Sequence, residues 1–156
     1  MSEPSFVYDT VIATTPERLW EALTSGEVTR RYWFDRRVES DWTPGAPVVF
    51  FDGASDVVTD RGEVLECDPP RRLVYRFAPI VDGTPFPATR VSFTLDPGAD
   101  GVRLLLVHDQ LAGPGDVEGW RRGWTPILTN LRSLLEGRVA DAAPPGRAAT
   151  SPRGAG

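Results

Sequence analysis

His108 is the only histidine of this 156-residue chain, and Cys67 is its only cysteine. Imidazole titrates near neutral pH, so His108 is a candidate general base or ligand anchor. The favoured alternative is a hydrogen-bonded histidine near the end of a strand. A single cysteine excludes an intrachain disulfide, and one histidine with no carboxylate at ligand spacing argues against a transition-metal site. Since no G-x-S-x-G nucleophile motif occurs either, we predict no catalytic residue, no metal and no cofactor.

Residues 113–119 lie between an expected strand and an expected helix, where a phosphate-binding loop would lie. The glycine spacing is wrong for such a loop, Pro114 has no amide proton to donate, and Asp116 and Glu118 repel phosphate. We therefore expect residues 113–119 to be a flexible connector that also covers one mouth of a cavity as a lid.

Arginine pairs lie near several turns and helix starts, and most of them are expected to be solvated. A pair that converged on a cavity would favour a carboxylate or phosphate on an otherwise apolar ligand. The pairs are Arg30 with Arg31, Arg36 with Arg37, Arg71 with Arg72, and Arg121 with Arg122.

Alternating apolar and polar residues, separated by clusters of Gly, Pro and Asp, predict an antiparallel meander. Alternation is strongest where Leu73, Tyr75 and Phe77 oppose their neighbours, which indicates a sheet with one dry face. The predicted strands are 6–13, 36–40, 47–51, 61–67, 72–77, 88–95 and 102–109.

Two short helices follow the first strand. Thr15 is a suitable N-cap, Pro16 suits the first helical position, and a second helix is expected over 27–33. Apolar residues at intervals of three and four then predict a long C-terminal helix. Either that helix starts near Val117 and kinks at Pro126, which we favour, or Thr125 caps a helix that begins at Pro126.

The order of these elements predicts an α+β fold, in which an antiparallel sheet of about seven strands curls around the C-terminal helix. Only that helix is long and apolar enough to cover the dry face of the sheet. A sheet of this size has more concave surface than one helix can fill. Large side chains plug the remainder, or it stays open as a pocket.

Residues 13–23, Ala-Thr-Thr-Pro-Glu-Arg-Leu-Trp-Glu-Ala-Leu, resemble the opening of the SRPBCC, or START-like, superfamily, and in particular its heat-shock protein 90 ATPase activator homologue family. Segments 62–73 and 102–108 and the pair Gly123-Trp124 resemble later parts of the same family, so the resemblance covers about 6–136. It implies a helix-grip fold with an internal cavity for hydrophobic small molecules. It does not imply a single activity, because fold and function separate in such superfamilies.

Aromatic residues are the strongest positive signal, because they fall on elements that surround the expected hollow. We predict binding of a hydrophobic or aromatic small molecule, with a polyketide cyclase or dehydratase-like enzyme and a chaperone ATPase-activating interaction protein as the alternatives that the resemblance implies. The predicted ligand-binding residues are Trp33, Phe34, Phe50, Tyr75, Phe77, Phe93, His108, Trp120, Trp124 and Leu128.

Composition sets the remaining expectations. The hydrophobic content of 40% and the length of 156 residues fit one globular domain over 6–136, with an N-terminal extension over 1–5 and a disordered Ala/Pro/Gly/Arg-rich tail over 137–156. The net charge of −5 argues against nucleic acid as a partner. No apolar run is long enough to insert into a membrane, and we expect a cytoplasmic protein.

Overall fold

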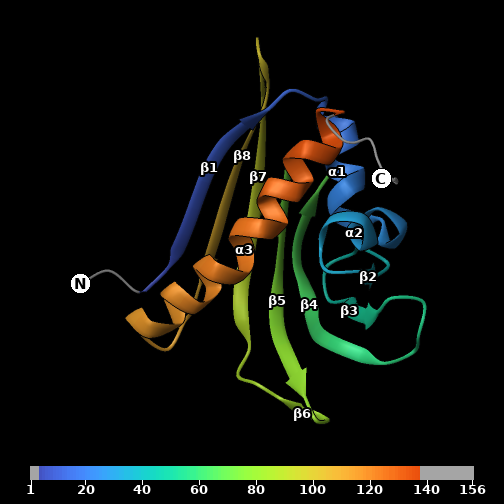
Figure 1. The fold of residues 1–156 in the computed structure, drawn as a ribbon, viewed down its shortest axis with the longest axis vertical. Coiled ribbons are helices and arrows are strands. Elements are labelled where there is room, and N and C mark those ends of the chain that lie inside the picture. Colours follow the sequence, from blue (N-terminus) through green and yellow to red (C-terminus); the bar gives the residue numbers. More distant parts are fainter. Residues whose placement is uncertain (1–3, 138–156) are drawn as a thin grey trace.

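A computed structural model describes residues 4–137 of the chain (Figure 1). Of the predicted tail over 137–156, only residue 137 is among them, so the expectation of disorder falls outside the described residues. The elements are β1 (Phe6–Ile12), α1 (Pro16–Thr24), α2 (Gly26–Tyr32), β2 (Arg36–Glu39), β3 (Pro47–Asp52), β4 (Val58–Asp68), β5 (Arg72–Val81), β6 (Thr84–Pro85), β7 (Thr89–Gly98), β8 (Gly101–Asp109) and α3 (Pro114–Leu135).

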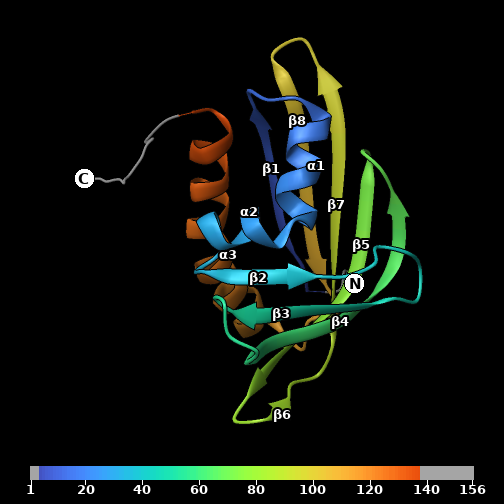
Figure 2. The same cartoon turned by 90° about the vertical axis from the view of Figure 1, so that its right-hand side faces the viewer.

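All strands belong to one antiparallel, 8-stranded sheet with the order β1-β8-β7-β5-β4-β3-β2, and β6 pairs with β5 beside this path. The sheet bends so strongly that β2 and β3 cross the direction of β7 and β8, while α3 runs along the concave face (Figures 1 and 2). The predicted α+β helix-grip architecture is confirmed. The two-residue strand β6 was not predicted, because Thr84 and Pro85 lie in a stretch that has the composition of a turn.

Helix α1 begins as its sequence predicts. The Thr15 side chain accepts a hydrogen bond from the Arg18 amide at 3.2 Å, and Pro16 occupies the first helical position. Helix α2 follows immediately after Ser25, which ends α1 and precedes Gly26. The two helices therefore form a compact corner beside the β2 edge of the sheet (Figure 2).

Helix α3 differs from its prediction at the N-terminal end. It begins at Pro114, so the stretch expected to be a flexible connector forms its first turns, and the predicted start near Val117 is wrong by one turn. Proline suits the first turn because an amide proton is not needed there. The helix continues through Pro126, so the alternative in which Thr125 caps a new helix is wrong; the Thr125 hydroxyl instead donates to the Arg121 carbonyl at 2.7 Å.

The core lies between α3 and the concave face of the sheet. The buried residues of α3 are Trp124, Ile127, Leu128, Leu131 and Leu135, and they meet inward-facing side chains of β5, β7 and β8. Burial of each such large apolar side chain contributes about 1.5–3 kcal/mol before the entropy of folding is subtracted. At the end of the helix, the Glu136 carboxylate accepts a hydrogen bond from the Ala13 amide at 3.0 Å and so joins α3 to the turn after β1.

Within residues 4–137, no helix is both long and apolar enough to cross a membrane.

Candidate functional site

Aromatic rings fill the space between α3 and the β3 to β7 part of the sheet. The ring centroid of Trp33 lies 4.9 Å from that of Phe50 and 5.1 Å from that of Trp124. Phe77 meets Phe50 edge-on at 5.5 Å. These separations are typical of favourable aromatic pairs. Of the two outcomes predicted for the concave face, the structure therefore shows large side chains packed against one another in this region.

The structure brings together all of the predicted ligand-binding residues except one. Trp33, Phe50, Tyr75, Phe77, Phe93, Trp124 and Leu128 are buried in one cluster, Trp120 packs against it, and His108 is buried beside it. Phe34 lies apart from them and is 53% exposed. It lies two residues after Tyr32, the last residue of α2, and has a φ of 52°, so the chain turns there and directs the Phe34 ring away from the interior.

His108 is completely buried, and both of its ring nitrogens are engaged. Trp124 Nε1 donates to His108 Nδ1 at 2.9 Å, and His108 Nε2 lies 2.7 Å from Thr89 Oγ1. The Thr89 hydroxyl gives its one proton to the Phe77 carbonyl at 2.8 Å. Because an indole nitrogen can only donate, Nδ1 carries no proton, and Nε2 must carry the proton that goes to Thr89. The imidazole is therefore neutral, with a defined tautomer.

This arrangement decides the chemical role of His108. Burial lowers the pKa of His108 to about 4, against the opposing charge of Asp109. Neither nitrogen is available to take a proton from a ligand without breaking a buried hydrogen bond. The structure thus shows the favoured alternative, a hydrogen-bonded core histidine, in place of a general base.

Trp120 marks the accessible side of the aromatic cluster. Its ring lies over His108 at 4.3 Å and meets Phe77 edge-on at 5.6 Å, but the residue is only half-buried. It stands on the N-terminal half of α3, one turn before the buried Trp124. Trp120 is therefore a ring of this cluster that keeps part of its surface exposed.

A buried carboxylate that is not among the predicted site residues, that of Asp60 on β4, also faces the interior. Asp60 is 4% exposed and pairs with Phe50 of β3, so it shares the inward face with that ring. Its Oδ2 accepts a hydrogen bond from Thr59 Oγ1 at 2.8 Å and lies 3.6 Å from Arg36 Nε. The predicted strand over 61–67 begins one residue after Asp60, whereas β4 begins at Val58. Alternation from the buried Val64 back through Gly62 to Asp60 was the signal that places it inward.

The arginine pairs are distributed mostly as expected. Arg37 forms an ion pair with Glu39 and lies over the Phe51 ring on the outer face, and Arg121 pairs with the exposed Glu118. Arg36 is the exception, because its register opposite Asp52 places it on the same face as Phe50 and Asp60. One arginine of the predicted pairs thus reaches the rim of the interior.

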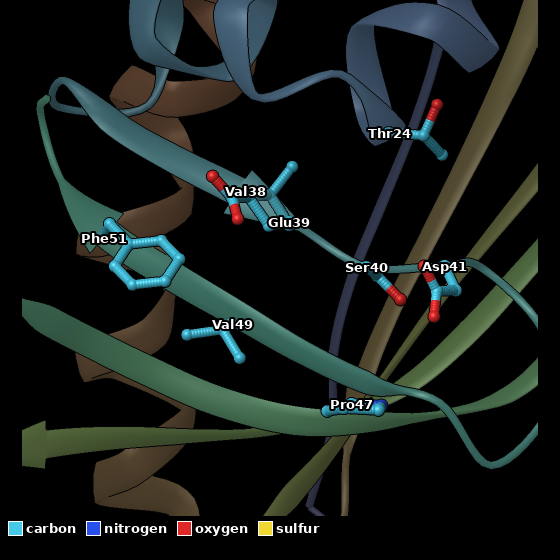
Figure 3. Close-up of a pocket in the computed structure, with 8 residues that line it drawn as sticks. All are labelled: Thr24, Val38, Glu39, Ser40, Asp41, Pro47, Val49 and Phe51. Carbon is cyan, nitrogen blue, oxygen red and sulfur yellow. The ribbon is translucent and has the colours of Figure 1, made fainter. Parts of the chain in front are cut away.

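A separate open pocket of about 520 Å³ lies beside the aromatic interior, between the C-terminal end of α1 and strands β2 and β3 (Figure 3). None of the predicted ligand-binding residues lines it. Its lining residues are Thr24, Val38, Glu39, Ser40, Asp41, Pro47, Val49 and Phe51. Within residues 4–137 no group of three His, Cys, Asp or Glu residues is placed to hold a metal ion.

Comparison with known families decides the relationship of this chain. The model of the family described as Activator of Hsp90 ATPase homolog 1-like protein matches residues 13–136. The chain belongs to this family. The resemblance identified in residues 13–23 and in the later segments is thereby confirmed. No curated protein matches this chain.

Solved structures share the fold of this family member. Protein ChR145 from Cytophaga hutchinsonii is 26% identical with a TM-score of 0.72, over 89% of this chain and 99% of its own. Protein MLL2253 from Mesorhizobium loti is 22% identical with a TM-score of 0.71, over 86% of this chain and 98% of its own. DynU16, a protein in the dynemicin biosynthetic locus, is 21% identical with a TM-score of 0.70, over 86% of this chain and 48% of DynU16.

Proposed function

We propose that this protein binds a hydrophobic or aromatic small molecule between the curved sheet and helix α3. The observation that carries the proposal is the set of aromatic rings from α2, β3, β5, β7 and α3 that face one another across the concave side of the sheet. Because these rings already pack on one another, a planar ligand must displace one of them, and it then takes over the stacking and edge-on contacts which that ring made. The ligand enters when the half-buried side chain of Trp120 rotates toward solvent and exposes Phe77 and His108, which its ring covers.

A thermal-shift and native mass-spectrometry screen tests this proposal. The compounds are naphthalene derivatives, long-chain fatty acids and polyketide-like aromatics. We expect a stoichiometric adduct and a raised unfolding temperature with the planar aromatics. Trp120→Ala should change the affinity for the bound compound, whereas Arg122→Ala, an exposed position on the same helix, should not. An interior to which no compound of the panel binds would contradict the proposal.

A second candidate function is catalysis of the cyclase or dehydratase type on an aromatic polyketide chain. Asp60 favours it, because burial raises the pKa of this carboxyl group at the edge of an aromatic interior. The structural neighbour DynU16 lies in the dynemicin biosynthetic locus. A turnover assay with a poly-β-carbonyl thioester should then show loss of product in Asp60→Asn and retention of product in His108→Gln. Equal turnover in wild type and Asp60→Asn would exclude Asp60 as the catalyst.

A further inference from the structure

Asp60 occupies a position that the fold would ordinarily give to an apolar side chain. Val38 of β2 and Asp60 of β4 both pair with Phe50 of β3, and all three point to the concave side. Val38 and Phe50 are core residues that are almost fully buried. A carboxylate at such a position loses most of its hydration, and hydrogen bonds or an opposite charge must offset this loss of solvation free energy.

The partners of Asp60 offset only part of the free energy lost on desolvation of its carboxylate. Thr59 donates to Oδ2, and the nearest guanidinium nitrogen, Arg36 Nε, is 3.6 Å away, which is beyond a good hydrogen bond. No residue in the described range 4–137 forms a hydrogen bond with Oδ1, and this oxygen keeps a small exposed area, since it is not among the fully buried atoms of that range that lack a partner. One oxygen of a nearly buried carboxylate is thus available to a molecule that is not part of the chain.

A second polar group in the interior is in the same situation. Tyr75 is 1% exposed, and its hydroxyl forms no hydrogen bond with residues 4–137, although the hydroxyl oxygen is not among the fully buried atoms that lack a partner and so keeps a small exposed area. Burial, with smaller contributions from Tyr32 and Asp60, raises the pKa of Tyr75, so the hydroxyl keeps its proton. Its ring packs on those of Phe50 and Phe77, beside the Asp60 strand.

We infer that Asp60 Oδ1 is the polar anchor of the interior site and that it accepts a hydrogen bond from a hydroxyl group carried by an aromatic ligand. This inference rests on the proposed function. The Tyr75 hydroxyl is the second polar group offered to the same ligand, as donor or acceptor. A ligand hydroxyl that reaches Oδ1 would take the place of solvent there and complete a hydrogen bond that the protein does not supply.

The charges around Asp60 select a neutral donor. A ligand carboxylate or phosphate would meet the acceptor-only Asp60 oxygen and be repelled. Arg36 lies beside Asp60 and offsets its negative charge, so a ligand cation gains less than it would from an isolated carboxylate. A phenol or enol supplies the proton that Oδ1 lacks and adds no net charge.

The test compares 2-naphthol with 2-methoxynaphthalene, which has the same ring system and oxygen but no proton to donate. By calorimetric titration of the full chain, we expect 2-naphthol to bind about tenfold more tightly, the ratio that corresponds to one hydrogen bond to a charged group. In Asp60→Asn the ratio should fall to about threefold or less. Glu63→Gln makes the same chemical change at an exposed position of the same strand and should keep the wild-type ratio.

The outcomes separate this inference from the proposed function. Equal affinity of both compounds for the wild-type chain would overturn the hydroxyl anchor and leave aromatic binding intact, whereas binding of neither compound would overturn both. An undiminished ratio in a folded Asp60→Asn would overturn the assignment to Asp60. The wild-type ratio does not depend on the folding of any variant, and Tyr75→Phe, which retains the ring, gives a second measurement in which we expect a reduced ratio.

Discussion

The indole Nε1 of Trp124 donates a hydrogen bond to Nδ1 of His108 at 2.9 Å, and this bond joins helix α3 to strand β8 in the middle of the core. It also sets the tautomer of the imidazole, because the indole can only donate. The Nε2–H group donates a hydrogen bond to the hydroxyl of Thr89 on β7, and this hydroxyl donates a hydrogen bond to the Phe77 carbonyl of β5. A single polar chain therefore connects the helix to three neighbouring strands.

Removal of the imidazole should destabilise the fold through its orphaned partners. His108→Phe leaves the Trp124 indole N–H unpaired in the core, and we expect a loss of about 1–3 kcal/mol in the free energy of unfolding. His108→Gln should lose less, because its amide has both an acceptor for Trp124 and a donor for Thr89. A double-mutant cycle measures this interaction: His108→Phe, Trp124→Phe and the double variant are each unfolded with a chemical denaturant. The two losses should be non-additive, with a coupling of about 1 kcal/mol; strict additivity would mean that the bond contributes nothing.

Acid should weaken the protein through the same histidine. The pKa of His108 falls from 6.5 to about 4 on burial, so the unfolded chain binds the proton first as the pH decreases. The contribution of the neutral imidazole is complete above pH 6.5 and is lost between pH 6.5 and about 4, up to about 3 kcal/mol. The stability difference between wild type and His108→Gln, measured by urea unfolding at pH 7 and at pH 4, should narrow accordingly. A constant difference would show that His108 does not titrate on unfolding.

Asp60 should have the opposite pH dependence. Burial raises the pKa of this carboxyl above 3.8, so the folded state favours the protonated form and is penalised as the pH rises through the folded-state pKa. Asp60→Asn should therefore be more stable than wild type at pH 7, and this advantage should disappear below the ordinary carboxyl pKa. Thermal unfolding from pH 3 to pH 8 measures the difference. A variant less stable than wild type at pH 7 would indicate that the carboxylate serves the fold and not a ligand.

Gly62 is required by the close approach of β4 and β5. A Cβ atom at this position would lie 1.6 Å from the Arg76 carbonyl oxygen, which belongs to the backbone and cannot move aside alone. Gly62→Ala should cost about 3 kcal/mol or more, because the two strands must separate. Gly119→Ala on α3 is the matched control. Apart from its two chain neighbours and the backbone of its own helix, no described atom lies within 4 Å of its added Cβ, and the higher helix propensity of alanine should stabilise the fold by up to about 1 kcal/mol. Denaturant midpoints of both variants check the contrast.

Local patterns in the sequence predict every helix, every strand except β6, and most of the residues that these elements bury. Alternation in residues 72–77 and 102–109, the Thr15-Pro16 start of α1 and the apolar stripe from Trp124 to Leu135 are local patterns with periods of two or 3.6 residues, and they persist in the structure. The family resemblance also lay in contiguous segments. The start of α3 does not follow from such a pattern, because Pro114 can begin a helix or belong to a loop. Only the packing of α3 across the sheet selects the helix.

The hydrogen bonds and burial of the site residues follow from contacts between distant parts of the chain. Nothing near His108 in the chain indicates that Thr89 and Trp124 occupy its two nitrogens, since these partners are 19 and 16 residues away. Asp60 looked like part of a turn until the pairing of β3 with β4 placed it beside Phe50. Hydrogen bonds and burial depend on which strands become neighbours, and that choice is made by the closing of the sheet around α3, which no local period encodes.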